Sequence, residues 1–228
     1  MEFKGKTILV AGGTGALGRA VTAAFVEEGA NVLVTYRKQN EFDALTQSPR
    51  LEGVQLDVTD ERAVVDAVNR IVLKHGQIDG LVNTIGGYTG GVKLWEVDPS
   101  VLDQMLALNL RSGYVLCRAI VPVMLKQEHG SIVNVAAKAA VDHPAGAAAY
   151  VASKAAAVGM MNSLAADLRG TGVRVNSILP SIIDSEANRK AMPAADHTKW
   201  AKPEDIAKVI LFLSSADAKL IHGASIPF

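Results

Sequence analysis

The sequence contains almost no cysteine, few aromatic residues and no excess of charge of either sign. Cys117 is the single cysteine among 228 residues, which excludes a disulfide within the chain and favours a reducing, cytoplasmic location. Basic and acidic residues number 23 each, so we expect neither nucleic acid nor an anionic membrane as a partner. A signal-peptide pattern and an apolar run long enough to cross a bilayer are both lacking. We also predict no metal site, because no second histidine or cysteine stands at ligand spacing.

Short apolar segments alternate with longer amphipathic ones along most of the chain. With 49% hydrophobic residues, the chain is long enough to enclose one sizeable core. Continuous apolar strands separated by helices indicate a parallel sheet covered on both faces. We therefore predict one α/β domain over residues 1–228, an open doubly wound sheet of the Rossmann type. Strands are expected over 6–13, 30–37, 53–60, 78–87, 131–137, 173–180 and 223–228, and helices over 15–29, 60–76, 98–130, 145–170 and 202–215.

Local signals mark the ends of two expected helices. Asp60 is a plausible N-cap and Gly76 a stop for the helix between them. Asp98 can cap the long helix that follows, and Gly130 is expected to end it. Pro122, inside that helix, should bend it.

A glycine-rich turn, AGGTGALG, follows the first expected strand at residues 11–18. Glycines there let the backbone approach a pyrophosphate, and the next helix offers free N–H groups and the positive end of its dipole. Such a turn also occurs simply to pack a helix on a strand. Its position directly after the first strand of an alternating chain favours the binding of a cofactor. The candidate cofactor-binding residues in it are Gly12, Thr14, Gly15, Ala16, Leu17 and Gly18.

The end of the second expected strand discriminates between two cofactors. A carboxylate there would bind the ribose hydroxyls of NAD, whereas an arginine would accept the 2′-phosphate of NADP. The chain has Tyr36, Arg37 and Lys38 at this point and no acid until Glu41. Arg37 can bind a phosphate with two parallel hydrogen bonds, which favours NADP(H) and leaves NAD(H) possible. The alternative is that Arg37 is a solvated surface charge.

Two further strand ends carry candidate contacts. Asp57 and Val58 are expected to end the third strand, where ligands bind in such sheets. Asn83 and Gly86 lie at the end of the fourth. Asn83 also has a local reading, as a residue that closes a turn.

Tyr150 and Lys154 lie four residues apart, so a helix places them on one face. The pKa of a free tyrosine, near 10, is high for acid–base catalysis at neutral pH. We expect the ammonium group of Lys154 to lower it, which suits a proton donor beside a hydride donor. Taken alone, this spacing usually means nothing more than two polar residues on a helix.

Over essentially its whole length the chain resembles the short-chain dehydrogenase/reductase family. The matching strings are GGTGALG, LDV at Asp57, VNTIGG at Asn83, LALNLRSGY at Asn109, YVASK and GVRVNSILP. The resemblance implies an NAD(P)-dependent oxidoreductase in which Tyr150 is the general acid. It implies Lys154 as the electrostatic partner and ribose contact, and Asn109 as the residue that holds a proton-relay water. Pro180 and Ile183, after the sixth expected strand, are further candidates for cofactor contacts.

The sequence departs from the family pattern at three places. Ala16 stands where the family usually has a glycine, and Ser181 follows Pro180 in place of a glycine. Ala137 stands where the family has a serine that orients the substrate. An alanine cannot donate a hydrogen bond to a carbonyl, and losing one such donor costs about 3 kcal/mol of transition-state stabilisation. Ser131 and Ser153 are not expected to replace it, because we expect both to lie away from the site.

One branch of the family, that of the dihydropteridine reductases, resembles the chain more narrowly in AAKAAVDHPAGAAAY, IGGYTGG and the segment 179–200. It also has an alanine and a lysine where Ala137 and Lys138 stand. The resemblance implies a planar, conjugated substrate such as a quinonoid dihydropterin, with Tyr88 stacked on its ring. The segment 185–200 would be a lid over the substrate. The candidate substrate residues are Tyr88, Ala137, Lys138 and His143, of which Lys138 and His143 can equally be surface residues.

Two other functions stay open at this point. A general carbonyl or ketoacyl-type reductase would manage without the serine by using water or Lys138. A non-catalytic NADP(H) sensor is disfavoured, because binding alone does not require Tyr150, Lys154 and Asn109. The apolar helices expected at 99–128 and 147–169 have more apolar surface than one sheet can cover, and the resemblance implies a homodimer or homotetramer built on them.

Overall fold

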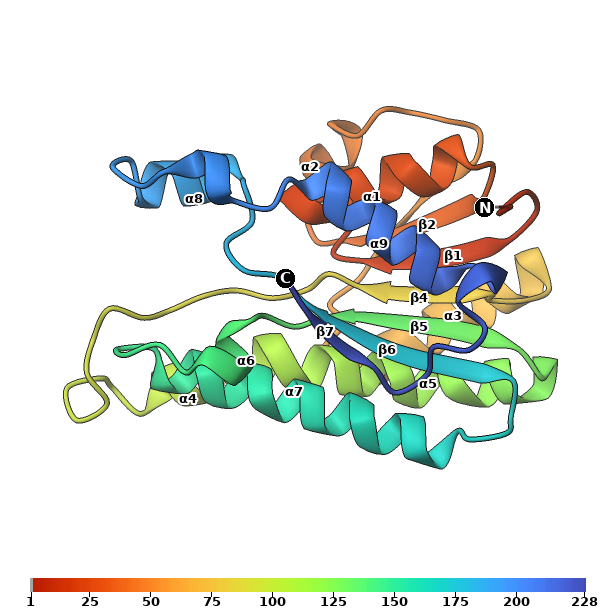
Figure 1. Cartoon of the computed structure of the whole chain (residues 1–228). Helices are drawn as coiled ribbons and strands as arrows, with labels where there is room; N and C mark the ends of the chain where they lie inside the picture. Colours follow the sequence, from red (N-terminus) through yellow and green to blue (C-terminus); the bar gives the residue numbers. More distant parts are fainter. Residues whose placement is uncertain (1) are drawn as a thin grey trace.

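A computed structural model describes residues 2–228 of the chain, and within that part seven strands form one parallel sheet (Figure 1). The strand order is β3-β2-β1-β4-β5-β6-β7, so the chain moves outward from β1 in one direction and then returns to continue in the other. This order confirms the expected doubly wound α/β fold. The strands are β1 (Thr7–Ala11), β2 (Asn31–Tyr36), β3 (Leu51–Gln55), β4 (Gly80–Asn83), β5 (Gly130–Val135), β6 (Val173–Leu179) and β7 (Ser225–Pro227).

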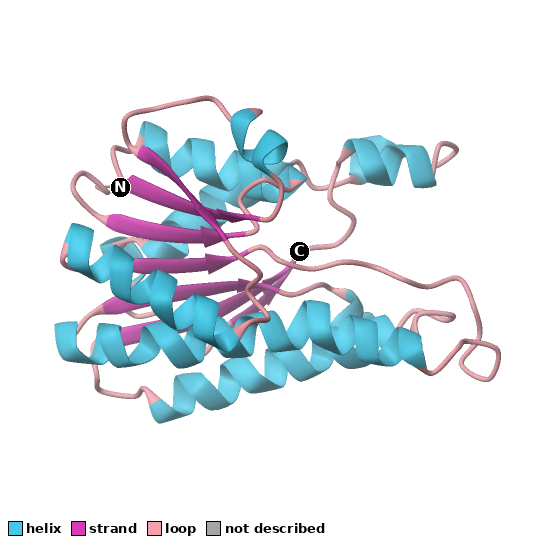
Figure 2. Ribbon diagram, turned by 180° about the vertical axis from the view of Figure 1, so that it is seen from behind, coloured by secondary structure: helices cyan, strands magenta, loops and turns pink. Residues whose placement is uncertain are grey.

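Helices cover both faces of the sheet, as Figures 1 and 2 show. One face carries α1 (Ala16–Glu27) and α9 (Pro203–Ser214), and the other carries α3 (Glu61–His75), α5 (Ser112–Gln127) and α7 (Ala148–Asp167). Shorter helices lie at the carboxyl-terminal end of the strands. They are α2 (Gln39–Asp43), α4 (Ser100–Leu106), α6 (Ala139–Asp142) and α8 (Glu186–Ala191).

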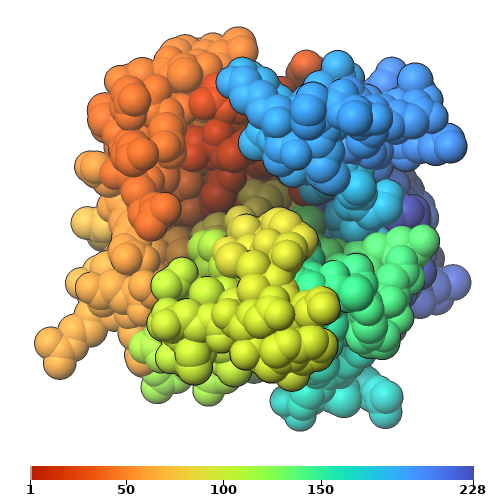
Figure 3. All heavy atoms as spheres, turned by 90° about the vertical axis from the view of Figure 1, so that its left-hand side faces the viewer, coloured from red at the N-terminus to blue at the C-terminus, as the bar shows by residue number. Residues whose placement is uncertain are grey.

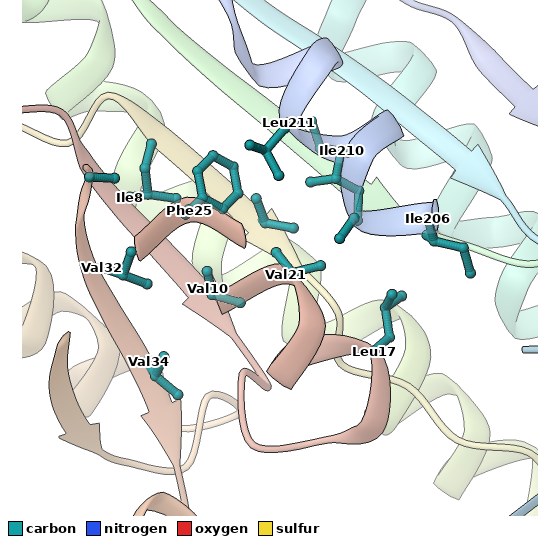
Figure 4. Packing of buried hydrophobic residues seen from close by; sticks show 14 of the residues in the cluster. Ile8, Val10, Leu17, Val21, Phe25, Val32, Val34, Ile206, Ile210 and Leu211 are labelled. Atoms are coloured by element: carbon teal, nitrogen blue, oxygen red, sulfur yellow. The ribbon is translucent and has the colours of Figure 1, made fainter. Parts of the chain in front are cut away.

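The continuous apolar run of β1 fills both layers of the core. Successive side chains of a strand point to opposite faces, so Ile8 and Val10 join the cluster under α1 and α9, while Leu9 joins the cluster on the other face. Figure 4 shows Phe25 of α1 and Ile210 of α9 within the first cluster. Burying such a side chain stabilises the fold by about 1.5–3 kcal/mol, which explains why Ile8, Leu9, Val10 and Ala11 are all apolar.

The expected ends of α3 are confirmed. The carboxylate of Asp60 accepts hydrogen bonds from the backbone N–H groups of Arg62 and Ala63 at 3.0 and 3.1 Å. Gly76 closes the helix in the left-handed conformation, with φ at +81°. These two residues act locally, which is why the sequence alone placed them.

The long helix expected over 98–130 is divided in the structure. α4 and α5 are joined by one π-helical turn, Ala107–Arg111, and α5 ends at Gln127 rather than at Gly130. Glu128 takes the left-handed conformation at the C-cap, and Gly130 already belongs to β5. The prediction of this end was wrong, because Gly130 pairs with Val173 of β6 and so belongs to the strand.

The stretch Ser100–Gln127 is long and apolar enough to cross a bilayer by length and composition, contrary to expectation. In the structure, however, its side chains at Leu116, Ile120 and Met124 are buried in the core cluster beneath the sheet. The apolar composition is therefore accounted for by packing within a layered domain.

Candidate active site

The ends of the strands open into a hollow between two projecting segments. Figure 3 looks onto this end of the molecule, with the segment containing α8 on one side and the loop between β4 and α4 on the other. A cavity of about 270 Å³ lies between the glycine-rich turn and the ends of β2 and β4. Its walls include Gly12, Thr14, Gly15, Tyr36, Arg37, Asp57, Val58 and Gly86 from the residues expected at the site, and Thr35, Glu41, Leu56, Thr59, Thr84, Ile85, Leu108 and Ser112, which were not expected there.

The glycine-rich turn is shaped by close backbone packing. A Cβ atom on Gly18 would lie 2.2 Å from the carbonyl oxygen of Gly12, so only glycine lets α1 approach the turn. Gly12 itself has φ at +77°, and Gly15 caps α1 without any side-chain hydrogen bond. The cap residue of a twelve-residue helix therefore lines the cavity, and the N-terminus of a helix is a favourable place for a pyrophosphate. Ala16 is exposed at the start of α1, whereas Leu17 is buried in the core and serves packing.

The end of β2 and the segment after β3 form the far wall. Asp57 and Val58 follow β3 rather than end it, because the strand stops at Gln55. The hydrogen bonds from the backbone and hydroxyl of Thr59 lower the pKa of Asp57, and the nearby charge of Arg37 lowers it further. Arg37 therefore lies in the cavity wall next to an ionised carboxylate.

Asn83 does not line the cavity. Its side chain is 1% exposed and its amide donates to the carbonyl oxygen of the Asn134 side chain at 3.0 Å. That bond joins the ends of β4 and β5, so Asn83 acts by fixing the strand ends beneath the site. The neighbouring Gly86 is a true wall residue, because a Cβ there would lie 2.8 Å from Nζ of Lys154 and 3.0 Å from Oδ1 of Asn109.

Asn109 lies at the centre of the π-helical turn and is buried. Its side chain accepts a hydrogen bond from the N–H of Gly87 at 2.9 Å and donates to the carbonyl of Gly87 at 3.1 Å. It also donates to Oγ of Ser153 at 2.9 Å, and that hydroxyl donates to the carbonyl of Tyr150. Ser153 was expected to lie away from the site, but it links Asn109 to the helix that carries Tyr150. Single π-helical turns are frequent at functional sites, and the pattern of apolar residues gives no sign of this one.

Tyr150 and Lys154 share one face of α7, as expected, but their pKa values do not follow the expectation. Burial raises the pKa of Tyr150 to about 12, and the phenol of Tyr88 adds to this rise. Burial lowers the pKa of Lys154 to about 8. The ammonium donates to the backbone carbonyl of Val135 at 3.2 Å. The expected lowering of the tyrosine pKa by the lysine was wrong for the protein alone, because loss of solvent outweighs the charge of a lysine that is itself desolvated.

Tyr88 is the candidate substrate residue whose contact with Tyr150 the structure records. The two tyrosine rings are 4.9 Å apart in an edge-to-face arrangement. Ala137 is buried, and Lys138 is turned toward Asp142 of its own helix, with Nζ 3.5 Å from the carboxylate. His143 is exposed at the end of α6 in the left-handed conformation.

The segment 185–200 projects from the body of the molecule at one side of the hollow (Figures 1 and 3), and its role as a lid stays a prediction. It contains α8, and its two ends are joined by a bridge between Ile183 and Ala201. Ile183 is thus placed at the base of this segment rather than in the cavity wall. Pro180, a little before it, accepts a hydrogen bond at its carbonyl from the N–H of Lys138.

Comparison with known proteins agrees with this geometry. The profile of the short chain dehydrogenase family matches residues 6–196, and the chain belongs to that family. The 3-oxoacyl-[acyl-carrier-protein] reductase FabG of Thermotoga maritima is 32% identical, covering 98% of this chain and 96% of that protein. The D-threitol dehydrogenase of Mycolicibacterium smegmatis is 33% identical, covering 99% and 92%.

Two solved structures show nicotinamide cofactors on the same fold. ElxO with NADP bound has a TM-score of 0.91 at 26% identity and covers 97% of this chain and 96% of its own. NAD+-bound xylitol dehydrogenase has 25% identity and covers 100% of this chain and 99% of its own. The chain is therefore an NAD(P)-dependent oxidoreductase that acts on a small molecule. The glycine turn and Gly86, where a Cβ would fill the space, fit such a cofactor. These relatives lend no support to the narrower resemblance to the dihydropteridine reductases. The pterin substrate that this resemblance implies stays a prediction.

Proposed function

We propose that the protein is an NAD(P)H-dependent carbonyl reductase in which Tyr150 protonates the substrate oxygen. The observation that carries the proposal is the position of two buried polar side chains, Lys154 and Asn109, behind Gly86, a wall residue of the cofactor cavity. A Cβ atom on Gly86 would lie 2.8 Å from Nζ of Lys154 and 3.0 Å from Oδ1 of Asn109, and Tyr150 stands one turn before Lys154 on α7. Lys154 is buried and donates to the backbone carbonyl of Val135, and burying a charged group with so few partners destabilises the fold, so its presence supports a role in the reaction. The family relatives named above interconvert alcohols and carbonyls, which favours the same reaction here.

Each protein group has a definite task in this reaction. A bound nicotinamide supplies the hydride. Tyr150 stays protonated at neutral pH, because its pKa is about 12, and so holds the proton for the oxygen that becomes an alcohol. Lys154 is largely an ammonium at neutral pH, and its charge stabilises the phenolate left behind. Asn109 is fixed by Gly87 and Ser153 and can orient a water that returns the proton.

For the cofactor we propose NADP(H), with NAD(H) as the weaker ligand. Arg37 follows directly after β2 and lines the cavity, where a guanidinium can bind a 2′-phosphate with two hydrogen bonds. Asp57 is on the same wall and is ionised, so part of the charge of Arg37 is already compensated.

A planar, conjugated substrate is the second candidate, and the alanine at 137 favours it. No hydroxyl stands beside Tyr150 at this position, and the side chain there is buried, so a substrate that needs a second donor is poorly served. A quinonoid dihydropterin is protonated at one nitrogen and needs no carbonyl clamp. Tyr88, which is 65% exposed beside Tyr150, offers a flat surface to such a ring.

The experiment is steady-state oxidation of NADPH and NADH with three substrates: a 3-oxoacyl thioester, an activated ketone and a quinonoid dihydropterin generated in situ. Turnover of the thioester or the ketone supports the carbonyl reductase. Turnover of the pterin alone supports the second candidate and contradicts the first. Tight NADPH binding with no turnover on any of them would contradict both and favour a cofactor sensor. Homo-oligomerisation and a cytoplasmic location stay predictions.

A further inference from the structure

Glu41 stands in the wall of the cofactor cavity together with Arg37 and Thr14. It lies on α2, a short helix directly after β2 that the sequence pattern did not predict. One carboxylate oxygen is 3.4 Å from the hydroxyl of Thr14 in the glycine-rich turn, and the other is 3.6 Å from Nζ of Lys38. The side chain is 41% exposed, so it faces both the cavity and solvent.

The backbone around Glu41 is fixed by several contacts. The guanidinium of Arg19 donates to the carbonyl oxygens of Thr14, Ala44 and Glu41, at 2.8, 3.1 and 3.4 Å. These bonds tie the glycine-rich turn to α2. The ring of Tyr36 stacks on Phe42 of the same helix, with centroids 4.9 Å apart. The carboxylate is therefore held at the turn by the fold and does not depend on its own weak hydrogen bond.

The end of β2 carries no acid, yet the cavity wall does. We infer that the carboxylate of Glu41 accepts hydrogen bonds from the adenosine ribose of the cofactor. It thereby favours NADH, whereas Arg37 favours NADPH. Free ribose hydroxyls can donate to Glu41, whereas a 2′-phosphate brings negative charge close to it and is attracted only by Arg37 and Lys38. The inference rests on the nicotinamide cofactor of the proposed function and names the residue that limits its selectivity.

The test uses Glu41→Gln, which keeps the size of the side chain and removes its charge. We expect the Kd of NADPH to fall by about three- to tenfold, because the negative charge close to the 2′-phosphate is removed. The Kd of NADH should rise by a similar factor, since a hydrogen bond to a charged group is replaced by a neutral one. Arg37→Gln should act in the opposite sense and raise the Kd of NADPH by about tenfold with little effect on NADH. Both Kd values are measured by titration calorimetry on the full chain.

Asp43→Asn is the matched control. Asp43 lies on the same helix and also loses one negative charge, but its carboxylate binds Gln39 and does not line the cavity. An equal shift in Asp43→Asn and Glu41→Gln would overturn the inference in favour of a general charge effect. Unchanged Kd values in Glu41→Gln would also overturn it and leave the proposed function intact. A wild-type protein that binds neither cofactor would instead contradict the proposed function itself.

Discussion

Burial acts in opposite senses on the two ionisable groups of the candidate active site. It disfavours the phenolate of Tyr150, whose pKa rises to about 12, and it disfavours the ammonium of Lys154, whose pKa falls to about 8. Both changes have the same main cause, the loss of solvent around the charged form, and Tyr88 adds to the rise at Tyr150. Their consequence is a site with a protonated tyrosine at all moderate pH values and a lysine that titrates within the working range.

This consequence predicts the pH dependence of reduction. A lysine pKa of about 8 means that the ammonium is present below pH 8 and is lost as the pH rises through that value. We expect kcat/KM for reduction to be level below pH 8 and then to fall, by about tenfold per pH unit. Initial rates from pH 6 to 10 at saturating NADPH measure it, and a level profile up to pH 10 would contradict this role of Lys154.

A second prediction concerns the proton donor. Tyr150→Phe keeps the ring but removes the only proton it can give, and we expect kcat to fall by about 100- to 10,000-fold. The affinity for NADPH should stay the same, because the phenol is not part of the cavity wall. Tyr114→Phe is the control, since Tyr114 is an exposed tyrosine of α5 outside that cavity. Full activity of Tyr150→Phe would contradict the proposed mechanism.

At the scale of the element, the site depends on two backbone features. One is the contact of α1 with the glycine-rich turn, and the other is the π-helical turn that carries Asn109 between α4 and α5. In both cases close backbone packing sets the position of groups at the site.

The contact at the glycine-rich turn can be tested with two alanine variants. Gly18→Ala places a Cβ 2.2 Å from a backbone oxygen, so we expect the free energy of unfolding to fall by about 1–3 kcal/mol. Gly15→Ala meets its nearest atom only at 3.4 Å and has a negative φ, so it should change stability by less than about 0.5 kcal/mol. Urea denaturation of both variants makes the comparison, and equal losses would show that the close approach is not the cause.

At the scale of the whole molecule, an apolar face remains open on the helices beneath the sheet. Leu106 and Leu110 from the α4 and π-helical region, Tyr114 of α5, and Ala156 and Met160 of α7 surround an open depression of about 600 Å³. Tyr114 is 57% exposed there. An uncovered apolar surface of this kind is typical of an interface between copies of one chain.

We therefore predict that Ala156→Asp shifts the protein toward the monomer, because it brings a charge into that face. Leu73→Asp is the control, since Leu73 is an equally apolar and 88% exposed residue on α3, away from the depression. Light scattering coupled to size-exclusion chromatography measures the mass. A wild-type monomer, or an unchanged mass in Ala156→Asp, would contradict an interface at this face.

The sequence by itself determined what local chemistry and periodicity control. The alternation of apolar strands and amphipathic helices predicted the doubly wound sheet, and Asp60 and Gly76 marked the ends of α3 because each acts within one turn of its own position. The glycine-rich turn and the Tyr150–Lys154 spacing were likewise visible, since both depend on neighbours along the chain.

Only the tertiary structure decided the rest, because it depends on contacts between distant segments. Ser153 joins the site through a hydrogen bond to a residue 44 positions away, and Glu41 enters the cavity because Arg19 ties α2 to the glycine-rich turn. The pKa values of Tyr150 and Lys154 follow from burial, which no spacing of residues reveals. Periodicity reports which face of a segment is apolar, whereas solvent exclusion and long-range hydrogen bonds exist only once the layers have packed.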